Sequence, residues 1–101
     1  MKISVEQALK ALHAHEGKTF LELFRTNAMS VEIYQPVGKD LQQPHAQDEI
    51  YVIISGHGMF QNGHEQYPFQ PGDLLFVPAH REHRFLQFSE DFKTWVIFIR
   101  Y

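Results

Sequence analysis

The sequence predicts an all-β fold, a β-sandwich or small barrel that follows one short helix. Two observations carry this prediction. Beyond residue 20, apolar and polar residues alternate with a period of two in short segments, which is the pattern of half-buried strands. Glycine- and proline-containing turns separate these segments at regular intervals, as in sandwiches and barrels. About eight strands are expected on this basis.

The helix is predicted over residues 4–15. Ser4 and Gln7 have the spacing of a capping box, in which each side chain accepts a hydrogen bond from the other residue's backbone. Gly17 ends the segment. Apolar residues recur in it at three- and four-residue steps, namely at Val5, Ala8, Leu9 and Leu12.

The strands follow in order. Asn62-Gly63 is a strong hairpin signal, Pro71-Gly72-Asp73 is a turn, and Pro36, Gly38 and Pro44 break up a longer loop. The alternation predicts strands over residues 20–25, 29–34, 49–54, 59–61, 64–67, 74–77, 84–88 and 95–100.

A chain of 101 residues fits one domain, so we expect a single domain over 1–101 with the helix in 1–17 and the β-barrel in 20–101. Residues 95–99, Trp-Val-Ile-Phe-Ile, are apolar on both faces. Such a strand is central in a sandwich or covered by a second chain. We expect a homodimer, and the alternative is that the N-terminal helix covers the second face.

Charge and composition exclude several function classes. Nine basic and twelve acidic residues give a net charge of −3, without a basic run, so nucleic acid is not an expected partner. No apolar stretch approaches the roughly 20 residues that cross a bilayer, and the N-terminus has no signal-peptide core, so we expect a cytoplasmic protein away from membranes. The absence of cysteine excludes disulfides and thiolate chemistry.

Histidine is the one residue type in excess, with seven copies. Side chains two apart share a face of a strand, so one stretch places four polar groups together: Gln43, His45, Gln47 and Glu49. Tyr51 continues this face into the expected interior. Burying these groups without partners is costly. A metal ion would give every lone pair a partner, so the stretch indicates a metal site.

His83 lies in a second polar stretch and shares strand parity with Phe85, an expected core residue. The prediction is a set of two histidines and one carboxylate, His45, Glu49 and His83, with the amide oxygen of Gln43 as a fourth ligand. Such ligands suit Fe(II), Mn(II), Zn(II), Ni(II) or Cu(II). The alternative is a pocket in which these side chains bind only one another and water. The expected pocket residues are Gln47, Tyr51, Phe60 and Phe85.

At these residues the sequence resembles the cupin superfamily in its small single-domain form. The first cupin motif, a glycine, His-x-His, a glutamate and a glycine, is matched by Gly38, Gln43-Pro44-His45, Glu49 and Gly56. The second, a glycine, a proline, a histidine and an asparagine, is matched by Gly72, Pro78, His83 and Gln87. The resemblance covers about residues 20–100. It implies a double-stranded β-helix, or jelly-roll barrel, around a divalent transition metal.

The chain departs from these motifs at three positions. Gln43 stands for the first metal histidine. In the second motif, His80 stands for a glycine two residues after the proline, and Gln87 stands for the final asparagine. An amide oxygen is a weaker ligand than imidazole, so we expect looser metal binding. The remaining histidines are expected on the surface or at turns: His13, His15, His57, His64 and His80.

Two functions are consistent with this reading. The first is a metal-dependent enzyme that acts on a small organic molecule in the barrel, with oxygenase-like or isomerase-like chemistry. The second is a non-catalytic module that binds or senses a small ligand. No catalytic residue beyond the ligand set stands out, and no serine occupies a nucleophile elbow.

Overall fold

The computed structural model describes residues 1–100, which form one helix and eight strands. These elements are α1 (Val5–His13), β1 (Phe20–Arg25), β2 (Met29–Tyr34), β3 (Asp48–Ser55), β4 (Gly58–Asn62), β5 (Glu65–Phe69), β6 (Leu74–Val77), β7 (His83–Leu86) and β8 (Lys93–Ile99).

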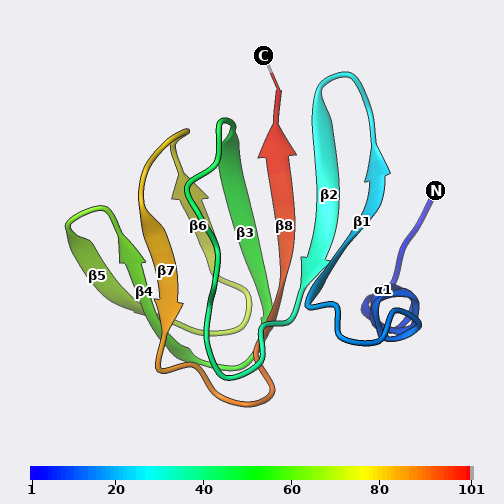
Figure 1. Ribbon diagram of the computed structural model, residues 1–101, viewed down its shortest axis with the longest axis horizontal. Coiled ribbons are helices and arrows are strands. Elements are labelled where there is room, and N and C mark those ends of the chain that lie inside the picture. Colours follow the sequence, from blue (N-terminus) through cyan, green and yellow to red (C-terminus); the bar gives the residue numbers. More distant parts are fainter. Residues whose placement is uncertain (101) are drawn as a thin grey trace.

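The strands form two antiparallel sheets that face each other (Figure 1). The larger sheet has the order β1-β2-β8-β3-β6, and the smaller has the order β5-β4-β7. Within residues 1–100 no strand ladder joins the two sheets, so hydrogen bonds do not close the barrel. The all-β jelly-roll prediction, with its short N-terminal helix, is confirmed.

Helix α1 begins where the capping box predicts. The Ser4 hydroxyl accepts a hydrogen bond of 3.1 Å from the Gln7 backbone, and the Gln7 side chain accepts one of 2.8 Å from the Ser4 backbone. Ala8 and Leu12 then bury one face of the helix against Ile33 of β2. The helix therefore covers one corner of the larger sheet, as Figure 1 also shows.

The main core lies between the two sheets and is largely aromatic. Inward residues of β3, β4 and β7 meet there because alternate side chains of a strand share a face. The Phe85 ring contacts those of Tyr51, Phe60 and Phe92 at centroid distances of 4.9, 4.6 and 4.6 Å. Edge and tilted ring contacts of this kind add to the stabilisation from burial.

The hairpin between β4 and β5 turns one residue later than predicted. Asn62 pairs with Glu65, so Gly63 and His64 make the connection. Asn62 is buried, and its amide donates hydrogen bonds to the Phe76 carbonyl and the Tyr67 hydroxyl. That burial keeps Asn62 in the strand, and Gly63 supplies the positive φ of +62°.

The outer face of the larger sheet carries an apolar row that crosses all five strands. The backbone register aligns its members, Phe24, Val31, Ile97, Ile50 and Phe76. In the neighbouring row, Trp95 packs against the cluster of Ala8, Leu12 and Ile33, to which the helix contributes two members. The helix therefore lies beside part of the second face of this strand. Within the described chain no helix is long and apolar enough to span a membrane.

Candidate metal centre and pocket

Three of the four predicted ligands converge although they come from different parts of the chain. His45 lies in the loop before β3, Glu49 is the second residue of β3, and His83 begins β7. Their candidate ligand atoms all lie within 4.8 Å of one another. Nε2 of His83 is 3.1 Å from Oε1 of Glu49, and Nε2 of His45 is 3.9 Å from the same oxygen. Glu49 and His83 are buried, while His45 is partly exposed.

The hydrogen bonds around these groups leave their lone pairs directed at one another. Nδ1 of His83 lies 2.9 Å from the Arg81 carbonyl oxygen, which can only accept, so Nδ1 donates. Neutral His83 therefore presents the lone pair of Nε2 to the Glu49 carboxylate. Among the described residues, both carboxylate oxygens of Glu49 and Nε2 of each histidine lack a hydrogen-bond partner. A cation fits this set, because it would satisfy all of these acceptors at once.

The two histidines differ in their electrostatic surroundings. Burial lowers the pKa of His45 more than the nearby Glu49 carboxylate raises it. Burial also lowers the pKa of His83, but the Glu49 carboxylate and the Arg81 carbonyl outweigh it, and the net pKa of His83 is raised. His45 is thus the readier of the two to present a neutral imidazole near pH 7.

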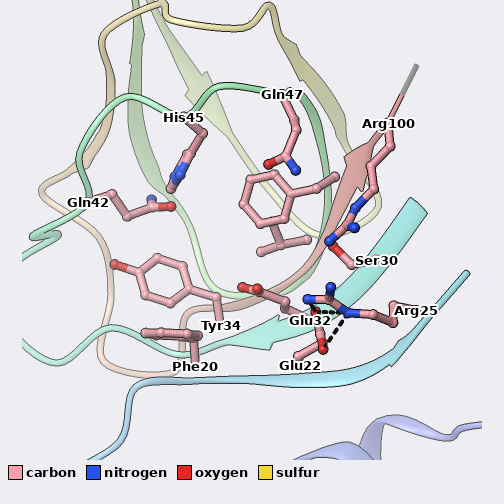
Figure 2. Close-up of a pocket in the computed structure, with 12 residues that line it drawn as sticks. Phe20, Glu22, Arg25, Ser30, Glu32, Tyr34, Gln42, His45, Gln47 and Arg100 are labelled. Carbon is pink, nitrogen blue, oxygen red and sulfur yellow. Dashed lines mark hydrogen bonds and ion pairs between the residues drawn. The ribbon is translucent and has the colours of Figure 1, made fainter. Parts of the chain in front are cut away.

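A cavity of about 360 Å³ lies beside His45 (Figure 2). Its walls come from the inner faces of β1, β2 and β8 and from the loop before β3. Pockets of this size suit small molecules. The lining residues are Phe20, Glu22, Arg25, Ser30, Glu32, Tyr34, Gln42, His45, Gln47, Val96, Phe98 and Arg100.

The cavity contains only part of the predicted pocket set. Gln47 lines it, whereas Tyr51, Phe60 and Phe85 do not and are fully buried in the aromatic core instead. Tyr51 and Phe85 face inward, as the strand alternation predicts. Side chains fill the barrel along β3, β4 and β7, so the open space remains along β1, β2 and β8.

Gln43 does not join the cluster. It is exposed and is not a cavity residue, whereas its neighbour Gln42 lines the cavity. The strand alternation that suggested Gln43 applies only from Asp48, where β3 begins. The side chain of Gln42 accepts a 3.0 Å hydrogen bond from the Tyr51 hydroxyl and donates one of 3.1 Å to Asp40. Gln42 therefore has partners of its own.

Asp40 is a site residue that sequence reasoning missed. It is buried and accepts four hydrogen bonds, from the Tyr34 hydroxyl, the backbone and side chain of Gln42, and the backbone of Phe85. These bonds fasten the loop that carries His45 to β2 and β7. A lone acid in a loop rich in glycine and proline gives no sequence signal for this role.

Glu32 is the second missed residue. Its carboxyl group points into the cavity (Figure 2). Burial, assisted by the charges of Glu22 and Glu49 and opposed by Arg25, raises the pKa of Glu32 to about 7. The signal was present in the sequence: Ser30, Glu32 and Tyr34 alternate on β2 as a polar face, and that face points inward.

The two departures in the second motif both fall at positive φ, which is +67° at His80 and +51° at Gln87. Glycine and asparagine tolerate this region better than other residues. The backbone N–H of His80 donates a 2.6 Å hydrogen bond to the His45 carbonyl, which joins the two motifs. Its side chain is exposed, as are those of His13, His15, His57 and His64.

Comparisons with known proteins agree with this geometry. A family model described as Cupin domain matches residues 30–98. An uncharacterized protein of Streptomyces coelicolor is 36% identical over 92 residues, covering 89% of this chain and 88% of that protein. The acireductone dioxygenase of Exiguobacterium sibiricum is 39% identical over 46 residues, covering 41% of this chain and 26% of the enzyme. The crystal structure of a cupin-2 domain containing protein from Shewanella frigidimarina has a TM-score of 0.72 at 16% identity, covering 97% of this chain and 94% of that one.

Proposed function

The chain belongs to the cupin family, and from that premise we propose that it is a metal-dependent enzyme that acts on a small organic molecule. One observation carries the proposal: buried acceptors of His45, Glu49 and His83 face one another without partners. Of the three, His45 also lines a cavity large enough for a small ligand.

His45, Glu49 and His83 would hold the ion through two imidazoles and one carboxylate. This set suits Fe(II), Mn(II), Zn(II), Ni(II) or Cu(II) and leaves coordination positions open. A bound ion would act there as a Lewis acid toward a substrate oxygen. Arg81 would orient His83 through its carbonyl, and the His80–His45 backbone bond would hold the two motifs together.

Oxygenase-like or isomerase-like chemistry is the reaction class we propose. The partial match to a dioxygenase supports it. Glu32 also supports catalysis over passive binding, because a cavity carboxyl with a pKa of about 7 can give or take a proton near neutral pH. The substrate would be the small-molecule partner expected from the sequence.

We also propose that the chain forms a homodimer through the apolar outer row of the larger sheet. Phe76 at its β6 end is 47% exposed, and no member of this row belongs to the hydrophobic cluster around the helix. Large exposed apolar patches mark interaction sites in soluble proteins.

The metal proposal is tested by elemental analysis of protein purified without chelators and by calorimetric titration with Mn²⁺ and Zn²⁺. We expect one ion per chain, and roughly a 100-fold or greater loss of affinity in His83→Ala, because a direct ligand contributes more than the outer partners whose loss costs about 10–100-fold. The matched control is His57→Ala, which alters an exposed histidine at the β3–β4 turn. Unchanged affinity in His83→Ala would contradict the proposal.

Catalysis is tested separately on the metal-loaded protein. Oxygen uptake and product formation are followed with a panel of diketones, phenols and sugars. Turnover that depends on His45 and Glu32 supports an enzyme, whereas ligand binding without turnover supports the sensor alternative.

A further inference from the structure

Arg100 places a cationic side chain in the wall of the cavity. It follows β8 directly, and its backbone N–H donates a 2.8 Å hydrogen bond to the Ala28 carbonyl. That bond fixes where the side chain starts. The guanidinium Nε is buried and has no hydrogen-bond partner among the residues that the structure describes. A buried donor in this state costs free energy unless a ligand accepts from it.

The other charged groups at this end of the cavity do not neutralise Arg100. Arg25 and Glu22 engage each other, with guanidinium-to-carboxylate distances of 2.6–3.1 Å. Arg100 lowers the pKa of Glu22 through its charge, yet within residues 1–100 it forms no ion pair. Figure 2 shows the dashed contacts of Arg25 with Glu22, and Arg100 beside Ser30 on the same side of the cavity.

The surroundings of Arg100 favour a carboxylate over a phosphate. A planar guanidinium presents its N–H groups in a fork that fits two oxygens of either group. Phosphate sites in proteins commonly add backbone N–H groups from a helix N-terminus. The one described helix, α1, packs on the outer face of the sheet and contributes nothing to the cavity.

We propose that the cavity binds a small carboxylic acid whose carboxylate is held by Arg100 and whose other end extends toward His45. The role of that other end rests on the proposed metal function, whereas the carboxylate site does not. Glu32 lines the same cavity. A ligand that extends from Arg100 toward His45 would therefore lie near the Glu32 carboxyl group, which could exchange a proton with it.

The probes are succinate and succinamide, which share a carbon skeleton and differ in charge. Calorimetry would be run on the full chain with and without Mn²⁺. We expect succinate to bind more tightly than succinamide. Arg100→Ala should weaken succinate roughly 10–100-fold, because a charge-assisted hydrogen bond contributes about 1.5–3 kcal/mol and 1.4 kcal/mol is tenfold. Succinamide binding should stay unchanged.

Lys10→Ala is the control, since Lys10 carries a positive charge, is exposed and lies outside this cavity. Arg100→Lys should recover part of the affinity, and Arg100→Gln serves if the alanine variant does not fold. Equal binding of the two probes, no succinate binding at tens of millimolar, tighter binding of inorganic phosphate, or an equal loss in Lys10→Ala would each overturn the proposal.

The two proposals fail in distinguishable ways. Arg100→Ala should keep the metal content of the parent protein, and His83→Ala should keep metal-free succinate binding. If the protein binds no metal but still binds succinate through Arg100, only the proposed metal function is refuted. If it binds metal but its succinate binding does not depend on Arg100, only the carboxylate site is refuted.

Discussion

The carboxylate of Asp40 accepts a 2.9 Å hydrogen bond from the backbone N–H of Phe85. Phe85 lies two residues beyond His83 on β7, and Asp40 lies in the loop that carries His45. The buried Asp40 side chain therefore links the loop of His45 to the strand of His83, although these two candidate ligands are far apart in the sequence.

Replacing Asp40 with asparagine should disturb this arrangement. The asparagine NH₂ group would replace a carboxylate oxygen that now accepts hydrogen bonds. The donors on that side would lose their acceptor, and an unsatisfied buried group costs about 1–3 kcal/mol. We expect Asp40→Asn to lose about that much unfolding free energy in urea titrations and to bind Mn²⁺ more weakly. Lys39→Ala, at an exposed neighbour, is the control. Parent-like values for both measurements would show that Asp40 does not hold the loop.

Glu32 should make the stability depend on pH. Its pKa is raised from 4.5 to about 7 in the folded chain, so the folded state holds this proton more tightly than the unfolded state. The resulting stability is complete below about pH 4.5 and is lost as the pH rises through 7. Glu32→Gln should therefore be more stable than the parent at pH 8, and equal to it at pH 4.

The gain at pH 8 should be on the order of 1 kcal/mol, after allowance for the solvent that reaches this half-buried carboxyl. Urea midpoints of metal-free protein at both pH values measure it. A difference that does not change with pH would rule out a titrating Glu32.

His80 should carry backbone strain, since its φ is +67°. A non-glycine residue in this region costs roughly 1–2 kcal/mol, and a glycine would remove that cost. Part of the gained stability is then lost, because glycine has more conformational freedom in the unfolded chain. We expect His80→Gly to stabilise the fold by about 1 kcal/mol. Thermal melts against Glu82→Gly, a neighbour outside the positive-φ region, provide the comparison. Destabilisation of both variants alike would show that His80 is unstrained.

Ile97 lies at the centre of the apolar outer row. A lysine there would place a charge in the proposed dimer contact, and desolvating it would be costly. Ile97→Lys should shift the mass measured by light scattering from dimer to monomer. Leu41→Lys, on a loop residue that is 72% exposed, should leave the mass unchanged. A monomeric parent protein would refute the dimer.

The sequence allowed the strands and the convergence of His45, Glu49 and His83 to be predicted, because both follow from local alternation and spacing. It did not allow the cavity to be located. Whether an inward side chain meets packed rings, as Tyr51 does, or open space, as Glu32 does, depends on which strands face each other. Gln43 was misplaced because strand parity was extended into a loop, and Asp40 acts through partners that no local pattern connects to it.

The aromatic core and the cavity occupy different parts of the same barrel interior, and this has an evolutionary consequence. Mutations at Ser30, Glu32 or Arg100 would change the cavity wall without repacking the rings of Phe60, Phe85 and Phe92. Under the proposed function, descendants of such a chain could therefore change ligands while inheriting an intact scaffold.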